Sequence, residues 1–225
     1  MSGKAFHRHD DAPMMIARGG MVFVVVPALI MGLLLITAIA VSSNVLALLT
    51  LPFGILFVVL LVFFRDPTRP IGKGIVSPAD GRVIEANRDT GFIAIYMGLR
   101  NVHVNRAPWS GIVNAMRRQS GGHAAASLKA ATNNQSVDWE IGTLLGTIEL
   151  RQIAGALARR IVPYVDEGAR IKKGQKIGLI RFGSRVELLL PPTAKVVVAV
   201  GDRLRAGETT VAEVEHGFAQ EDTPG

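Results

Sequence analysis

Two apolar runs of twenty residues each constrain this chain more than any other feature of its sequence. In residues 21–40 the only polar side chain is Thr37, and in residues 45–64 it is Thr50. Each run is long enough to cross a hydrocarbon core of roughly 30 Å. A cleaved signal peptide would be shorter, would end in a small-residue cleavage site and would not be followed by a second run. The sequence therefore predicts a membrane helical hairpin over residues 21–64.

Basic residues flank this hairpin on both sides, and the turn between the runs carries no charge. They are Lys4, Arg8, Arg18, Arg65, Arg69 and Lys73. Because basic flanks stay in the cytoplasm, both ends of the hairpin are predicted to be cytoplasmic. This places a tail at residues 1–20 and the rest of the chain on the cytoplasmic face of the cell (inner) membrane. The net charge of +7 suits an anionic lipid surface as the first partner.

The composition excludes several classes of function. The 225 residues include no cysteine, which excludes disulfides, thiolate metal sites and a cysteine nucleophile, and no other metal site is predicted. Only two Trp and two Tyr are present, and no motif interleaves aromatic with basic residues, so a nucleic-acid partner is not expected. A membrane-anchored enzyme and a membrane-anchored binding module both stay open.

From residue 65 onward, short apolar runs rich in Val and Ile alternate with Gly, Pro and Asp. Examples are residues 83–86, 92–97, 102–104, 161–165, 176–181, 186–190 and 195–200. This spacing is typical of antiparallel β structure, so we predict a mainly β domain, a sandwich or barrel with little helix, over residues 65–214. Helix is expected only at residues 150–160 and, as a short turn, near 127–131. Residues 215–225 are predicted to form a flexible tail.

The β domain contains an internal repeat. Residues 165–175 and 198–208 align at an offset of 33 residues, and both read G-x-x-[IL]-x-x-G-[QE]. Each glycine can supply a positive φ at a tight turn, and the Ile or Leu between two glycines can point into a core. Biotinyl and lipoyl carrier domains have hairpins related in this way. They also carry an exposed lysine at a hairpin tip, which is not evident here, so this likeness concerns architecture only.

Two segments place polar residues where they can do chemistry. Residues 77–81, Ser-Pro-Ala-Asp-Gly, are a turn signature, and the carboxylate of Asp80 could also orient a base or a serine. Residues 101–108 alternate so that His103 and Asn105 share one strand face, close to Arg106. Such a face can transfer a proton and bind an anion, although a solvated strand face would give the same pattern.

The region around this second segment is basic. Residues 90–137 contain no Asp or Glu, which suits an anionic ligand or lipid headgroups, although a solvated basic face would look the same. The basic and histidine residues of this region are Arg100, His103, Arg106, Arg117, Arg118, His123 and Lys129. His123 follows two glycines and is expected in a mobile loop.

Gly183 and Ser184 join two apolar runs, which a hairpin turn alone would explain. The chemical alternative is self-cleavage. Ser184 Oγ would attack the carbonyl of Gly183 and convert the amide to an ester. β-Elimination would then leave dehydroalanine, which hydrolyses to a pyruvoyl group, and backbone strain at such a site would be part of the mechanism.

Three motifs, in this order after a membrane hairpin, resemble the phosphatidylserine decarboxylase family, and most of all its short bacterial and archaeal branch. They are residues 77–81 (SPADG), 102–108 (VHVNRAP) and 182–191 (FGSRVELLLP), and the similarity runs from about residue 63 to 214. The resemblance implies a self-processing, pyruvoyl-dependent lyase, cleaved between Gly183 and Ser184. Its β chain, 1–183, and α chain, 184–225, would form a heterodimer, and a higher homo-oligomer stays open.

The resemblance also implies roles for single residues. Ser184 would be the source of the pyruvoyl cofactor, Asp80 would act in self-cleavage and His103 in decarboxylation. The amine of the phosphatidylserine substrate would condense with the pyruvoyl ketone, and the imine would take up the electrons left by departing CO2. Arg106, Asn105 and His123 are the candidates for binding the headgroup.

Two departures from the family pattern leave open which base assists Ser184. Arg106 stands where the long bacterial branch has a second histidine, and residues 134–136, Asn-Gln-Ser, stand where the family has Asn-Glu-Arg. Two other functions are compatible with the sequence: a non-catalytic, membrane-anchored biotinyl-like adaptor, and a decarboxylase of an archaeal ether-lipid serine phospholipid. Because every candidate residue follows Arg65, a chain beginning there is expected to be soluble and to cleave itself.

Overall fold

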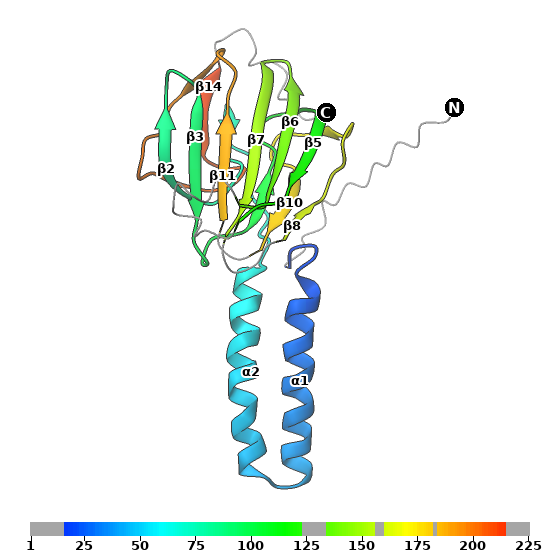
Figure 1. The fold of residues 1–225 in the computed structure, drawn as a ribbon. Helices are drawn as coiled ribbons and strands as arrows, with labels where there is room; N and C mark the ends of the chain where they lie inside the picture. The colour runs from blue at the N-terminus through cyan, green and yellow to red at the C-terminus, as the bar shows by residue number, and fades with distance from the viewer. Residues whose placement is uncertain (1–15, 123–133, 156–159, 182–183, 215–225) are drawn as a thin grey trace, which may run out of the picture.

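The computed structural model describes residues 16–122, 134–155, 160–181 and 184–214. Its N-terminal part is a pair of apolar helices, α1 (Met21–Ala40) and α2 (Asn44–Phe63), which extend side by side from one end of a β domain (Figure 1). The hydroxyl of Ser43 caps α2 by accepting a hydrogen bond from Leu46 N at 3.4 Å. Both helices are long and apolar enough to cross a membrane. The predicted helical hairpin is thus confirmed to within one residue at its boundaries.

The described part of the chain after the hairpin is mainly β and contains no α-helix. Its strands form one sheet of eight, in the order β13-β2-β3-β11-β7-β6-β5-β9, and two sheets of three, β1-β14-β12 and β4-β10-β8. The strand bounds are β1 Ile75–Val76, β2 Gly81–Asn87, β3 Phe92–Met97, β4 Val104–Arg106, β5 Gly111–Gln119, β6 Ser136–Thr143, β7 Gly146–Ala154, β8 Ile161–Pro163, β9 Arg170–Ile171, β10 Lys176–Ile180, β11 Ser184–Leu189, β12 Ala194–Val196, β13 Arg203–Leu204 and β14 Thr210–Val214.

The two small sheets pack behind the large one, and the layers share one apolar core (Figure 1). Ile177 and Val211 of the small sheets and Ile95, Trp139 and Val186 of the large sheet all belong to that core. The prediction of a β sandwich is confirmed. The sheets do not close into a barrel.

The predicted repeat is present in the fold. Its two copies give the two-residue strands β9 and β13, and Ile171 and Leu204 are buried in the core. The four glycines that bracket these strands all have positive φ: Gly168, Gly174, Gly201 and Gly207. A positive φ is a conformation that glycine adopts without steric cost.

The repeat extends further than the glycine pattern. Gly168 N donates to Val113 O and Gly201 N to Val83 O, at 2.8 and 2.9 Å. Gly174 N and Gly207 N likewise donate to Ala107 O and Ser77 O, both at 2.8 Å. Residues 77–83 therefore correspond to residues 107–113, and the turn that contains Asp80 is half of a pseudo-symmetric pair.

One predicted element is wrong. Residues 150–160 were expected to be helical, but β7 runs to Ala154 and pairs with β6 over residues 146–153 and with β11 over residues 149–154, while residues 156–159 lie outside the described residues. The residues of this segment are good helix formers, yet Ile148, Leu150 and Gln152 alternate toward the interior with period two. Pairing with two neighbouring strands outweighs local propensity here. The short helical turn expected at 127–131 lies outside the described residues.

The hairpin and the β domain share a second, smaller apolar cluster. Phe63 and Phe64 pack there with Val102, Val104 and Leu179, and all five side chains are buried. The remaining members are Ala17, Val24 and Leu60. This packing argues against the expectation that a chain beginning at Arg65 would behave as an independent soluble domain, because such a chain would expose half of the cluster.

Candidate active site

Ser184 lies at the first position of β11, at the end of the large sheet from which the hairpin extends (Figure 1). It pairs with Met97 of β3 on one side and Ala154 of β7 on the other. Its side chain is fully buried, and its Oγ lies 3.2 Å from the sulfur of Met97. A thioether is a weak hydrogen-bond acceptor, so this contact leaves the hydroxyl available for another partner. Gly183 lies outside the described residues.

The side chain of Asn105 is directed to the same sulfur. Its Nδ2 lies 3.7 Å from Met97 Sδ and 3.3 Å from Pro78 O. Its Oδ1 accepts a hydrogen bond of 2.7 Å from Gln152, whose own oxygen accepts one of 2.8 Å from the indole of Trp139. An indole N–H only donates, so this chain of bonds fixes both amide groups and directs the NH2 of Asn105 toward Pro78 O and the Met97 sulfur, which Ser184 Oγ also contacts.

His103 is fully buried immediately before β4, and the ring of Phe63 covers it at a centroid distance of 4.2 Å. Its Nδ1 lies 2.9 Å from the carbonyl of Asn101. A carbonyl only accepts, so Nδ1 carries the proton and Nε2 presents a lone pair. Nε2 is buried and has no hydrogen-bond partner in the described part of the chain.

Burial lowers the pKa of His103 to about 4, although the Asn101 carbonyl and the carboxylate of Asp80 oppose this shift. The ring is therefore neutral at physiological pH. A neutral imidazole with a free Nε2 lone pair is equipped to accept a proton.

Asp80 is buried in the turn before β2 and is held by three partners. It forms a bidentate pair with Arg69, whose second contact is 2.9 Å, and it accepts hydrogen bonds from Ala206 N at 2.8 Å and Val102 N at 3.4 Å. The bond from Val102 links the carboxylate to the residue next to His103. These bonds hold the carboxylate in place, and its charge acts on the ring of His103.

Arg106 lies on β4 but makes its contacts inside the domain. Its guanidinium donates to Gly174 O at 3.1 Å and Pro67 O at 3.0 Å, and it lies 3.7 Å from the carboxylate of Asp66. These contacts tie β4 to the turn before β10 and to the segment that follows the hairpin. Of the other two candidates for headgroup binding, Asn105 contacts the same Met97 sulfur as Ser184, and His123 lies outside the described residues.

The solvated strand face that was the alternative explanation for His103 and Asn105 is not what the structure shows. Both residues are fully buried, as are Val102 and Val104 on the opposite face. The basic region of residues 90–137 is also dispersed: Arg106 points inward, and Arg117 pairs with Glu140 on the large sheet at 3.6 Å.

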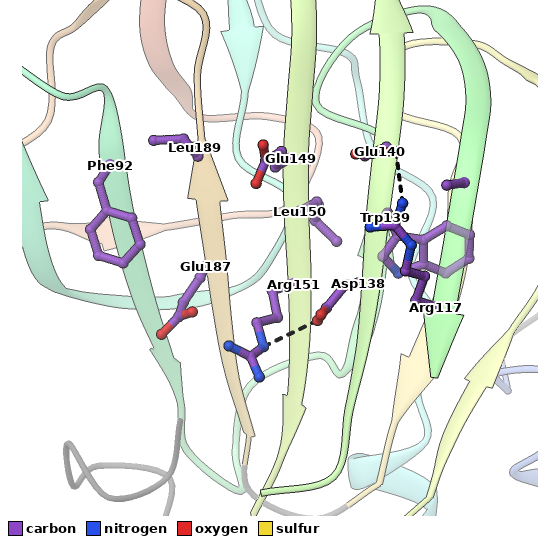
Figure 2. Close-up of a pocket in the computed structure, with 11 residues that line it drawn as sticks. Phe92, Arg117, Asp138, Trp139, Glu140, Glu149, Leu150, Arg151, Glu187 and Leu189 are labelled. Atoms are coloured by element: carbon purple, nitrogen blue, oxygen red, sulfur yellow. Dashed lines mark ion pairs between the residues drawn. The ribbon is translucent and has the colours of Figure 1, made fainter. Parts of the chain in front are cut away.

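Figure 2 shows a pocket that is separate from these residues. It has a volume of about 280 Å³ and lies over strands β3, β11, β7, β6 and β5. Ion pairs between Arg151 and Asp138, at 3.1 Å, and between Arg117 and Glu140 occupy its surface. Neither Ser184 nor His103 lines it, so this pocket is not the candidate active site.

Comparison with known proteins decides the family. The profile of phosphatidylserine decarboxylase matches residues 56–212, which is more than half of the chain. The chain belongs to the phosphatidylserine decarboxylase family. Its membership makes it a decarboxylase of the lyase class, and the relatives are named as proenzymes.

Relatives of this decarboxylase occur in bacteria and archaea. A phosphatidylserine decarboxylase proenzyme of Streptomyces coelicolor is 48% identical over 156 residues, covering 68% of this chain and 72% of its own length. One from Thermobifida fusca is 46% identical over 151 residues, covering 65% and 70%. A putative archaetidylserine decarboxylase proenzyme of Archaeoglobus fulgidus is 44% identical over 158 residues, covering 68% and 77%.

Sequence reasoning missed three residues that contact the candidate site residues: Met97, Gln152 and Phe63. A signal existed for Gln152, since it is a polar residue at an inward position of an alternating segment. Phe63 could not be found in this way, because in the sequence it is one apolar residue among twenty.

Proposed function

We propose that this protein decarboxylates phosphatidylserine to phosphatidylethanolamine and CO2, after cutting its own chain between Gly183 and Ser184. The observation that carries the proposal is a buried serine at the start of a central strand, whose hydroxyl contacts a weak sulfur acceptor that an oriented amide also contacts. A serine with a purely structural role in such a place would satisfy its hydroxyl with a strong acceptor such as a carbonyl.

Self-cleavage requires a group that removes the proton of the Ser184 hydroxyl. Attack of Oγ on the carbonyl of Gly183 exchanges an amide for an ester. Elimination then releases the β chain with a carboxylate at Gly183, and hydrolysis of the remaining dehydroalanine releases ammonia and leaves the pyruvoyl group on the α chain. The role proposed for Asp80 is in this stage, where its fixed charge favours proton uptake by a neighbouring base.

His103 is proposed to act in decarboxylation, where a proton must return to the α-carbon of the product. The alternative is that the buried Nε2 lone pair receives the Ser184 proton during maturation. The phenotype of a histidine variant separates the two roles, as set out in the Discussion.

The residues present fit a pyruvoyl group at position 184. The position is buried, and the oriented NH2 of Asn105, which shares the Met97 sulfur with Ser184, is a donor that could bind a carbonyl oxygen. When bound, a pyruvoyl group supplies a conjugated carbonyl that withdraws electrons from an attached amino acid. Asn105 and His103 then have the tasks of orienting the headgroup and handling the proton.

The hairpin is proposed to hold the enzyme in the cell membrane, with the β domain on the cytoplasmic face. Exposed apolar residues cover most of both helices, and basic residues lie at both ends of the hairpin. Attachment beside the bilayer suits a lipid substrate. The α and β chains of one precursor would remain together, because β11 of the α chain lies between β3 and β7 of the β chain.

Ser184→Ala tests the proposal directly. The wild-type protein should give two bands on a denaturing gel and release CO2 from phosphatidylserine, whereas the variant should give one band and no CO2. A variant that still splits would overturn the assignment of Ser184. A wild-type chain that never splits would favour a non-catalytic adaptor. Assays with ester-linked and ether-linked serine phospholipids would separate the bacterial from the archaeal substrate class.

A further inference from the structure

Arg181 lies three residues before Ser184 and contacts the start of the hairpin. One of its terminal nitrogens donates to Gly19 O at 2.8 Å, and its guanidinium carbon stands 4.7 Å from the centroid of the Phe23 ring. Gly19 and Phe23 flank the first residue of α1, so the guanidinium lies at the level where the apolar run begins.

This guanidinium has unused hydrogen-bonding capacity. Its Nε is buried and has no hydrogen-bond partner among the residues that the structure describes. Among the described residues, the Arg181 guanidinium forms no ion pair with a carboxylate. Arg69, Arg106 and Arg185 each form one. A buried N–H donor without a partner is costly, which points to a missing acceptor.

The surroundings of Arg181 are basic. Arg181 N donates to the carbonyl of Arg160 at 3.1 Å, and both burial and the charge of Arg160 lower the pKa of the Arg181 guanidinium. The carbonyl of Arg18 accepts from the hydroxyl of Tyr164 at 2.7 Å, which brings a third arginine to this end of the domain. Neither Arg160 nor Arg18 has an ion-pair partner within the described ranges. An anion at this position would reduce the repulsion among the three charges.

We propose that Arg181 binds the phosphodiester group of the lipid substrate. This inference rests on the proposed function and adds the residue that recognises the phosphate. Planar guanidinium groups bind phosphate oxygens through paired hydrogen bonds, and the level of α1 at which Arg181 lies is where lipid phosphates meet the hydrocarbon region. Three residues of extended chain span at most about 10 Å, a distance that an arginine side chain and a phosphoserine headgroup can bridge together.

The test uses the mature full-length enzyme in neutral-detergent micelles that contain short-chain phosphatidylserine. Arg181→Gln should still be cleaved into two chains, and its KM should rise by about tenfold while kcat stays within about threefold, since a charge-assisted contact to the substrate is lost. Arg88→Gln is the matched control. Arg88 is an exposed arginine in the turn between β2 and β3, at the opposite end of the large sheet. The KM of the Arg88→Gln enzyme should therefore equal that of the wild-type enzyme.

A substrate variant keeps the test valid if Arg181→Gln fails to fold. The methyl phosphotriester of phosphatidylserine lacks the negative charge on phosphorus, so the wild-type enzyme should use it with a kcat/KM about tenfold lower. Arg181→Gln should not distinguish the two lipids. Equal use of both lipids by the wild-type enzyme would overturn the proposal, and so would an unchanged KM for Arg181→Gln.

A further arm separates the substrate from other anionic lipids. If KM changes only when phosphatidylglycerol is added to the micelles, Arg181 binds a neighbouring lipid and the substrate assignment is wrong. Failure of the proposed function would look different, because the wild-type chain would then remain uncut or would release no CO2.

Discussion

The environment of His103 differs strongly from that of an exposed histidine. The Asn101 carbonyl fixes its tautomer, the Phe63 ring excludes water, and the pKa falls to about 4. A histidine with a lowered pKa stabilises the fold at neutral pH, and this contribution is lost as the pH falls from about 6.5 toward 4, where the unfolded chain binds the proton and the folded chain does not.

We predict that His103 does not titrate between pH 7.5 and 5.5. In the uncleaved Ser184→Ala protein, NMR signals of the 15N-labelled ring should keep the pattern of a neutral Nδ1–H tautomer across this range. A short histidine-containing peptide in the same buffer, which titrates near pH 6.5, serves as the reference. A midpoint for His103 above pH 6 would contradict the burial argument and the tautomer derived from it.

The roles of Asp80 and His103 are predicted to separate on a gel. Asp80→Asn keeps the shape but removes the fixed charge, so the precursor should accumulate. His103→Ala should yield cleaved chains that release CO2 at least about a hundredfold more slowly, which is the usual loss when a general acid is removed. If His103→Ala also accumulates precursor, the histidine is the base for Ser184 as well. The reverse pattern would exchange the two roles.

At the scale of elements, the end of α2 forms a wall of the candidate site. Phe63 is 3% exposed. Its ring belongs to the second apolar cluster, which the hairpin and the β domain share, and it also covers the ring of His103. The last turn of the hairpin therefore sets the polarity around a candidate catalytic group, in addition to the membrane attachment proposed for the hairpin.

We predict that Phe63→Ala raises the pKa of His103 toward 6.5, because water would reach the ring, and that it destabilises the domain by about 3 kcal/mol. The same NMR titration measures the first effect. Leu48→Ala is the control, since Leu48 is an exposed apolar residue near the other end of the same helix and should leave the titration unchanged. An unaltered His103 pKa in Phe63→Ala would show that the ring does not exclude water.

Much of the fold could be predicted from local pattern. The helical hairpin follows from the length of its apolar runs, and β3 follows from a short run bounded by turn residues. β9 and β13 follow from the glycine repeat. β7 could not be predicted, because its sequence suits a helix and only its pairing with β6 and β11 makes it a strand.

The site was predictable in part and for a different reason. Ser184, His103 and Asp80 occur in motifs that carry chemistry, so their types and spacing identify them as candidates. Their environment is set by residues distant in the sequence: Arg69 fixes Asp80, Met97 contacts Ser184, and Gln152 orients Asn105. Such contacts depend on strand order and register, which no local pattern specifies.

At the scale of the whole molecule, the hairpin and the β domain are joined by shared packing. The main core lies within the sandwich, but the second cluster takes members from both the hairpin and the β domain. Arg181 adds a polar contact to the same junction. Processing, catalysis and membrane attachment are therefore expected to depend on one another rather than to reside in separable modules.

We predict that a chain beginning at residue 65 aggregates and processes slowly, because it lacks Phe63 and Phe64 and exposes Val102, Val104 and Leu179. Losing two buried phenylalanine side chains costs about 3 kcal/mol or more each, which is a large share of a domain's stability. The matched control shortens the hairpin from its far end by joining residue 32 to residue 52 through a glycine linker, so that both helix ends stay docked. In detergent this control should split at the full-length rate, as followed by the appearance of two bands over time. If the chain beginning at residue 65 is soluble and splits equally fast, the hairpin is an anchor alone, and its packing against His103 has no part in maturation.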